Sequence, residues 1–252
     1  MTQSLAHGDQ VGNRRFIIIG LPRSGTTYLM TLLNSHQDVS CAGELFNPYS
    51  IVAHEGPDYD PAKVFQRDHA PRYFLDQFFK EQEAGSAARI GFKLMLGHNL
   101  RVLTYLQEMP DVPLIYVWRN NRLAQVASFL KAVQTKNWAQ TRRSADMSKR
   151  IVATPQTISH YWHEYATMDF LFEQWVKTLP NPQFKVEYRD LFKPGFNAQV
   201  CDFLGIGLDR KMKSPLVKQG ANRVLDRFEN PGPIDAYIKR VGRESWLETE
   251  LN

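Results

Sequence analysis

Short apolar runs alternate with amphipathic stretches along most of this chain. Four runs rich in β-branched and aromatic residues predict buried strands, at residues 15–20, 89–95, 113–118 and 184–188. Apolar residues at helical spacing predict helices, at residues 26–34, 64–83, 100–109, 121–133 and 196–204 and from Pro155 onward. Pro71 requires a new helix to begin within the second of these stretches. Strands that alternate with helices predict an α/β fold, with a central parallel sheet covered by helices on both faces.

The remaining stretches predict loops. Residues 41–60 are rich in Gly, Pro, Asn and Asp, and the remainder of the chain after residue 204 is polar and interrupted by Gly220, Pro231, Gly232 and Pro233. The start of the chain is polar and has no apolar segment of the kind that signal peptides carry. We therefore expect a flexible tail at residues 1–14 and a single domain over residues 15–252.

Composition narrows the function classes. The chain has 252 residues, with 31 Lys and Arg against 26 Asp and Glu, a formal charge of +5. The basic residues are scattered and are not interleaved with aromatics, which argues against a nucleic-acid-binding module. No apolar run approaches the roughly 20 residues that span a bilayer. Two cysteines make neither a disulfide framework nor a metal cluster, so we expect a cytoplasmic protein.

Ligands of parallel sheets bind beyond the carboxyl ends of the strands. After the first predicted strand, Gly20 and Gly25 have the G-x-x-x-x-G spacing of a phosphate-binding loop, in which backbone N–H groups and a helix N-terminus hold an anion. Thr26 stands where kinases and nucleotide hydrolases carry Lys, and a cation lies inside the loop instead, as Arg23. No apolar strand ends in an Asp suited to magnesium. The loop therefore favours a group with less charge than a triphosphate–metal complex.

A second candidate anchor follows the third predicted strand. Arg119 stands at the strand end, and Ser128 lies nine residues later on the following helix. The guanidinium offers paired planar donors and the serine adds a hydroxyl, so the two side chains can hold one phosphate from two sides.

These motifs resemble a known family. The segment PRSGTTYL resembles the 5′-phosphosulfate loop of the sulfotransferase superfamily, P-[KR]-[ST]-G-[ST]-[ST], and Arg119 with Ser128 resembles its 3′-phosphate motif. The segments VEYRDL and FLGI resemble the family's "YEDL … FLGI" region. Lys218-Gln219-Gly220 resembles its late basic loop, although it departs from the fuller "RKG" form. The nine-residue spacing and the following LKAVQTKNWAQT are most similar to bacterial carbohydrate sulfotransferases, of the trehalose, nodulation-factor or lipopolysaccharide type.

The resemblance implies a P-loop-like α/β fold and a metal-free enzyme. Its donor would be 3′-phosphoadenosine 5′-phosphosulfate (PAPS), its product adenosine 3′,5′-bisphosphate, and its acceptor a hydroxyl group, on a carbohydrate or glycolipid. The donor-binding residues it implies are Arg23, Ser24, Gly25, Thr26, Thr27, Arg119, Ser128, Tyr188 and Lys218. Tyr188 would lie near the adenine. Arg23 is also a catalytic candidate, because negative charge grows on the leaving phosphate oxygen beside it.

The acceptor hydroxyl must lose a proton, so a general base is expected. The resemblance to the bacterial carbohydrate group favours Glu44, in the segment AGELFN. His98 is the alternative, because animal members use a histidine after the corresponding strand. Lys93, near the end of its strand, is expected to face the cleft. His160 and His163 lie three residues apart on a helix whose apolar stripe explains the region, and no third metal ligand accompanies them.

Two other functions remain open from the sequence. One is a nucleotide-dependent kinase with a degenerate phosphate loop, which would bind ATP and magnesium. The other is a non-enzymatic module that binds anions or nucleic acid, which would show steep salt dependence. The sequence names no acceptor and leaves the oligomeric state open, a homodimer included.

Overall fold

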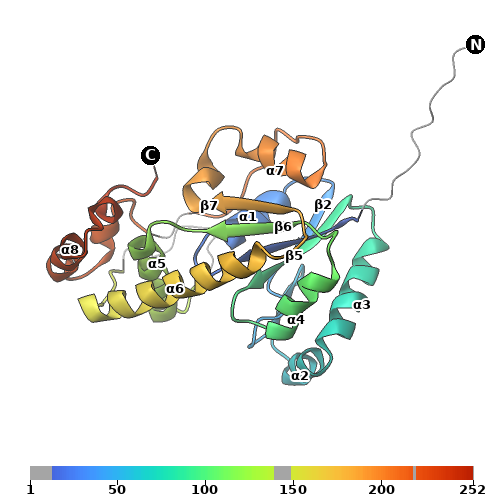
Figure 1. The fold of residues 1–252 in the computed structure, drawn as a ribbon, viewed down its shortest axis with the longest axis horizontal. Coiled ribbons are helices and arrows are strands. Elements are labelled where there is room, and N and C mark those ends of the chain that lie inside the picture. Colours follow the sequence, from blue (N-terminus) through green and yellow to red (C-terminus); the bar gives the residue numbers. More distant parts are fainter. Residues whose placement is uncertain (1–12, 139–148, 218–219, 252) are drawn as a thin grey trace, which may run out of the picture.

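A five-stranded parallel sheet forms the centre of the molecule (Figure 1). The computed structural model describes residues 13–138, 149–217 and 220–251. The strands lie in the order β2 (Val39–Ala42), β5 (Arg89–Met95), β1 (Arg15–Gly20), β6 (Leu114–Trp118) and β7 (Gln183–Glu187). Each neighbouring pair is parallel. The predicted α/β fold is confirmed, and all four predicted strands are present.

Helices cover both faces of the sheet, because its strands carry apolar side chains on both faces. Along β1, Phe16 and Ile18 pack on one face, and Ile17 and Ile19 pack on the other. The first face is covered by α1 (Thr26–Leu33) and α7 (Phe196–Leu204). The helices and short 3-10 turns of the opposite face are α3 (Pro71–Glu83), α4 (Leu100–Tyr105), η1 (Leu106–Glu108), α5 (Arg122–Thr135) and α6 (Pro155–Val176). In Figure 1, α7 lies above the sheet and α3, α4 and α6 lie below it.

The prediction of a loop over residues 41–60 is wrong in part. Cys41 and Ala42 complete β2, and a hairpin of β3 (Ile51–Ala53) and β4 (Gly56–Asp58) follows. These strands have only three or four residues each, too few to give an alternating pattern of their own. Pairing with β5 holds β2 in place. The next helix, α2 (Pro61–His69), is capped by the Asp60 carboxylate, which accepts from the backbone N–H of Ala62.

The region after residue 220 is also more regular than predicted. It contains η4 (Val224–Arg227), α8 (Pro231–Arg240) and η5 (Glu244–Leu247), and Ile234, Ile238 and Trp246 pack into the same core as α5 and α6. Pro231 does not interrupt a helix here but begins one, at the position where a missing N–H costs nothing. The end of the segment returns to its beginning, because Thr249 pairs with Arg223.

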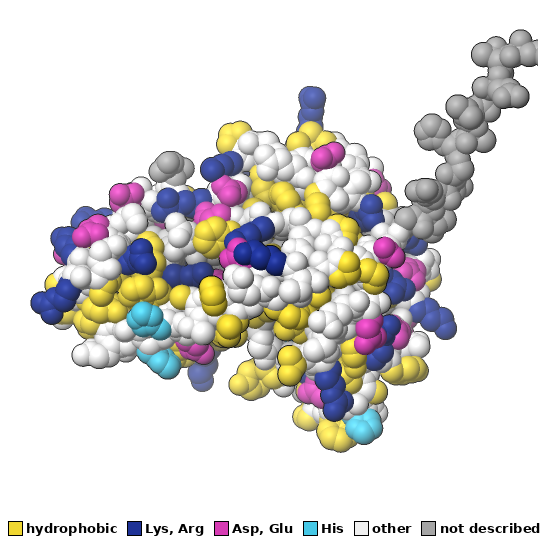
Figure 2. Space-filling model, in the orientation of Figure 1, with side chains coloured by type: hydrophobic (Ala, Val, Ile, Leu, Met, Phe, Trp, Pro, Cys, Tyr) yellow, Lys and Arg dark blue, Asp and Glu magenta, His cyan; other side chains and the backbone are white. Residues whose placement is uncertain are grey.

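The remaining short element, η3 (Tyr188–Phe192), joins β7 to α7 at the carboxyl ends of the strands. Acidic and basic side chains are intermixed over the face drawn in Figure 2, with no continuous basic stripe on that face. Several polar residues are instead buried near the carboxyl ends of β1, β5 and β6, among them Ser24, Thr26, Lys93 and Arg119.

Candidate active site

The loop between β1 and α1 forms a cradle for an anion. Gly20 has no room for a side chain, because an added Cβ would lie 2.5 Å from the Val117 carbonyl oxygen. Gly25 adopts the left-handed backbone region, with φ of 107°. The Ser24 hydroxyl is buried, and it has no hydrogen-bond partner within the part of the chain that the structure describes. Such a curled backbone at a helix N-terminus, with one buried hydroxyl donor left unpaired, is suited to binding an anionic group such as a phosphate.

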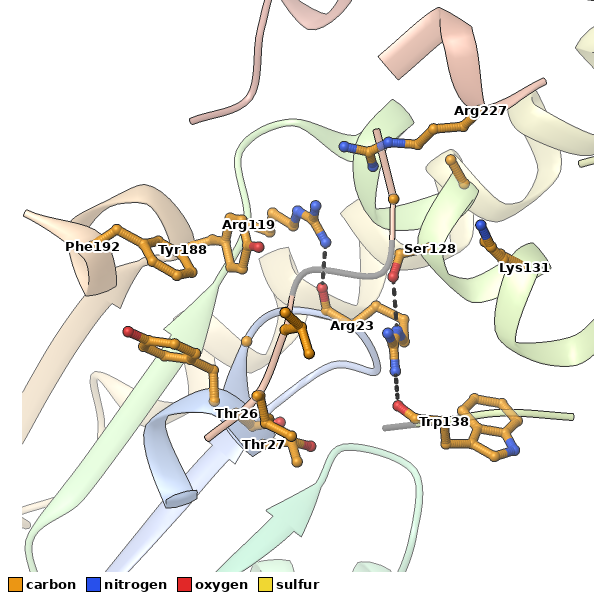
Figure 3. A pocket seen from close by; sticks show the side chains of 16 residues that line it. Arg23, Thr26, Thr27, Arg119, Ser128, Lys131, Trp138, Tyr188, Phe192 and Arg227 are labelled. Atoms are coloured by element: carbon orange, nitrogen blue, oxygen red, sulfur yellow. Dashed lines mark hydrogen bonds between the residues drawn. The ribbon is translucent and has the colours of Figure 1, made fainter. Parts of the chain in front are cut away.

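Arg23 is held in a strained conformation in the middle of this loop. Its φ of 64° is uncommon for a residue other than glycine, and such outliers cluster at functional sites. Its Nε donates to Ser128 Oγ at 2.9 Å, and its Nη1 donates to the Trp138 carbonyl oxygen (Figure 3). Burial, with Arg119 nearby, lowers the Arg23 pKa to about 10, so the guanidinium stays charged at neutral pH.

Arg119 links the second anchor to the first. It follows β6 directly, and its Nη1 donates to the Arg23 carbonyl oxygen at 2.8 Å. Its guanidinium lies 4.1 Å from the centre of the Tyr188 ring. The structure therefore brings Arg23, Arg119, Ser128 and Tyr188 to one pocket, together with Gly25, Thr26 and Thr27. Lys218, which the sequence also predicted at this site, lies outside the described residues.

Several pocket residues have no counterpart among the sequence predictions. Tyr28 and Phe192 add to the aromatic wall begun by Tyr188, with ring centres 4.6 Å apart between Tyr28 and Phe192. Lys131, one turn after Ser128 on α5, also lines the pocket. Its position on the helix of Ser128 was a signal that the sequence did offer, because residues three apart on a helix share a face.

Arg227 reaches the pocket from a part of the chain far from the phosphate loop, and Glu250 supports it. Arg227 lines the pocket, and its Nη2 donates to Glu250 Oε2 at 2.7 Å. Arg119 Nε donates to Glu250 Oε1, also at 2.7 Å. The two arginines thus share one carboxylate whose side chain is fully buried. Although burial alone would raise the Glu250 pKa, the two arginines lower it to about 2. No local motif marks either residue, so sequence patterns could not find them.

A second polar cluster adjoins the loop. Lys93 points from β5 toward α1, and its Nζ donates to Thr27 Oγ1 at 2.7 Å and lies 2.8 Å from Glu44 Oε1. Asn47 Nδ2 donates to the other oxygen, Glu44 Oε2, at 2.6 Å. Burial would raise the Glu44 pKa, but Lys93, Asn47 and His98 outweigh it and hold this pKa below its usual range. Glu44 is therefore an ionised carboxylate near neutral pH.

His98 lies beside this carboxylate without bonding to it. Its Nε2 is 3.9 Å from Glu44 Oε2, beyond hydrogen-bond distance. Its Nδ1 is buried and lacks a hydrogen-bond partner among the described residues. Burial lowers the His98 pKa, and Lys93 and Arg67 act in the same direction against Glu44. The imidazole is therefore neutral near pH 7, so both candidate bases are in the form that accepts a proton.

Across residues 13–138, 149–217 and 220–251, no group of three or more His, Cys, Asp or Glu side chains is placed to hold a metal ion. His160 instead faces Glu164 on the surface of α6. Within the same ranges, no helix is both long and apolar enough to cross a membrane.

Comparison with known proteins shows the family of this chain. The chain matches the sequence profile of the sulfotransferase family over residues 15–210. Nodulation protein H of Rhizobium meliloti (strain 1021) is 26% identical over 230 residues, covering 89% of this chain and 87% of that protein. Nodulation protein H of Rhizobium tropici is 25% identical over 219 residues, covering 84% of each chain. The solved sulfotransferase domain from the curacin biosynthetic pathway superposes with a TM-score of 0.47 at 17% identity, over 94% of this chain and 90% of that one.

Proposed function

The chain belongs to the sulfotransferase family, and we propose that it transfers a sulfuryl group from PAPS to a hydroxyl group of a carbohydrate acceptor. One observation carries this proposal. Lys93 bonds both to Thr27, at the start of the helix behind the phosphate loop, and to the carboxylate Glu44. A candidate base is thereby fixed beside the place where the transferring end of the donor would lie.

The two anchors suit the two ends of the donor. The N–H groups between Ser24 and Thr27, with the α1 N-terminus, would hold the 5′-phosphosulfate. Arg119 and Ser128, with Arg227 beside them, would hold the 3′-phosphate, and the aromatic wall of Tyr28, Tyr188 and Phe192 would cover the adenine. Apart from Ser24, these residues line one pocket, so one ligand could contact both anchors.

PAPS supplies a sulfuryl group that is activated by its bond to a phosphate oxygen. The acceptor oxygen forms a bond to sulfur while the bond from sulfur to that phosphate oxygen breaks, and the electron pair stays on the phosphate. Arg23 and the loop N–H groups stabilise this growing charge. Glu44 takes the acceptor proton. Lys93 holds the carboxylate in place and loses no proton itself.

His98 remains the competing base. It is neutral and its Nε2 faces the same carboxylate. We assign the base to Glu44 because Glu44, and not His98, is tied by Lys93 to the donor-binding loop.

A carbohydrate acceptor is supported by two features. The spacing of Arg119 and Ser128 resembles that of bacterial carbohydrate sulfotransferases. Beside the loop, the Trp138 side chain lines the pocket and is 52% exposed, as an aromatic platform for a sugar ring would be.

The test is a transfer assay with sulfur-labelled PAPS against trehalose, chitotetraose, a glycolipid and p-nitrophenol, with and without a chelator. We expect label on a sugar or glycolipid, one adenosine 3′,5′-bisphosphate released per transfer, and no effect of the chelator. Exclusive transfer to p-nitrophenol would refute the acceptor class. Hydrolysis of ATP that depends on magnesium, with no sulfuryl transfer, would instead favour the kinase alternative.

A further inference from the structure

Tyr165 on α6 has a buried hydroxyl that the fold does not use. Its side chain is only 4% exposed, and its hydroxyl has no hydrogen-bond partner within the described part of the chain. Burying an unpaired hydroxyl destabilises a fold, so such groups are rare and call for an explanation. The buried hydroxyl of Tyr116 shows the usual arrangement, because it donates to Asp169 Oδ1 at 2.5 Å. A phenylalanine at position 165 would serve the core equally well.

Neighbouring contacts place Tyr165 beside the reaction site. Its ring centre lies 5.9 Å from that of Phe129, which directly follows Ser128 on α5. One turn further along α6, Met168 Cε would lie 3.8 Å from a Cβ added to Gly97, the residue before His98. Residues three apart on a helix share a face. This face of α6 therefore extends from α5, the helix that carries Ser128, to the loop that carries His98.

Charge contacts agree with this placement. Burial is the larger effect and raises the pKa of Tyr165, while the positive charge of Arg23 opposes it. Arg23 also interacts electrostatically with Glu44. The remaining groups that act on Tyr165 are Glu164 and Tyr161, both on its own helix. The Tyr165 phenol and the Glu44 carboxylate thus both lie within electrostatic reach of the Arg23 guanidinium.

A second aromatic wall, exposed at Trp138 and partly buried at Phe129, adjoins Tyr165. It consists of Trp138 and Phe129, whose ring centres lie 6.1 Å apart. The Trp138 carbonyl accepts from Arg23, which fixes the start of this wall relative to the phosphate loop. Such a wall suits the apolar face of a sugar ring, and a polar group at its base suits a sugar hydroxyl.

We propose that Tyr165 is an acceptor-binding residue, whose hydroxyl forms a hydrogen bond with a hydroxyl of the sugar while Trp138 covers the sugar's apolar face. The inference rests on the proposed carbohydrate acceptor. The sugar hydroxyl would provide the hydrogen-bond partner that the Tyr165 hydroxyl lacks in the fold. A site of this kind discriminates well, because an acceptor without the matching hydroxyl leaves the phenol unpaired and buried.

The test compares Tyr165→Phe with Tyr161→Phe, a matched control one turn earlier whose ring also packs on Phe129. For both variants and the parent, four quantities are measured: the free energy of unfolding in urea, the Kd for adenosine 3′,5′-bisphosphate, the Kd of the nucleotide-loaded protein for trehalose and chitotetraose, and kcat/KM for the better of these sugars. We expect Tyr165→Phe to be as stable as the parent or more stable, and to bind the nucleotide unchanged. Its sugar affinity and kcat/KM should fall roughly tenfold, as for a lost hydrogen bond, while Tyr161→Phe should resemble the parent.

Three outcomes would overturn the inference. Gained stability with parental sugar binding and kcat/KM would make Tyr165 a core residue only. A weaker Kd for the nucleotide with unchanged sugar binding would assign the hydroxyl to the donor. Equal losses in both variants would mean that packing, not the hydroxyl, matters. Failure of the proposed function has a different signature, since the parent itself would then bind neither sugar and transfer label to neither.

Discussion

Removing the Glu250 carboxylate should destabilise the protein strongly, even though the residue stands third from the end of the chain. Its two oxygens accept from Arg119 and Arg227, and the three side chains are at most 5% exposed. In Glu250→Gln the shape stays the same and the charge is lost. Two buried guanidinium groups then face each other with no shared anion.

Two routes give the magnitude. The arginines lower the Glu250 pKa from its ordinary 4.5 to about 2, and a difference of that size corresponds to about 3 kcal/mol of folding free energy. Removing one partner from a buried ion pair typically costs about 3–5 kcal/mol. We therefore expect Glu250→Gln to lower the free energy of unfolding by about 3 kcal/mol at pH 7.

The pH dependence has a definite sign. A carboxylate with a depressed pKa in the folded state stabilises the protein fully above its unfolded value, and this stabilisation is lost as the pH falls toward the folded value. The difference between parent and Glu250→Gln should therefore be full above about pH 5 and shrink as the pH falls from 4.5 toward 2.

Urea unfolding at pH 7, 5, 4 and 3 would measure this difference, with Glu248→Gln as the control, because Glu248 is exposed on the same segment. A loss below about 1 kcal/mol at pH 7, the range of an exposed ion pair, would refute the reasoning. So would a difference between parent and variant that stays constant down to pH 3, because it could not come from an ionised carboxylate.

Three further predictions concern the reaction itself. Arg119→Ala and Ser128→Ala should raise the Kd for adenosine 3′,5′-bisphosphate by about tenfold to a hundredfold, with the milder effect at Ser128, and calorimetry that gives parental Kd values would contradict the 3′-phosphate assignment. Arg23→Ala should lower kcat much more than nucleotide affinity, because in the proposed mechanism its charge stabilises the leaving oxygen, and equal losses would mean that Arg23 only binds. Glu44→Gln should lower kcat by about 10²- to 10⁴-fold with nucleotide affinity unchanged, whereas near-parental turnover in Glu44→Gln together with an inactive His98→Ala would assign the base to His98.

Sequence patterns predicted the parts of the site that local chemistry defines. A buried strand, a turn with two glycines and a helix start occur within a few residues, and each constrains the next, so the phosphate loop between Gly20 and Thr27 could be placed in advance. The same holds for Arg119, because it follows a strand directly and the carboxyl ends of parallel strands meet at one edge.

Residues brought in by the tertiary fold could not be predicted in this way. Glu250 reaches Arg119 only because the chain folds back through α8 and pairs Arg223 with Thr249. Tyr165 lies in the core beside other apolar residues of its helix, where its position alone gives no sign of function. Its unpaired hydroxyl becomes visible only once all of its neighbours are known.

The position of Lys93 explains how the candidate base can lie close to the proposed donor-binding loop without sharing residues with it. On β5, Phe92 and Leu94 point to the face that carries α5 and α6, so Lys93 points to the opposite face, toward α1. There its ammonium meets Thr27, in the first turn of α1. Because β5 lies between β1 and β2, the same ammonium also reaches Glu44, just beyond the end of β2. One lysine on the strand between β1 and β2 therefore links the candidate base to the phosphate loop.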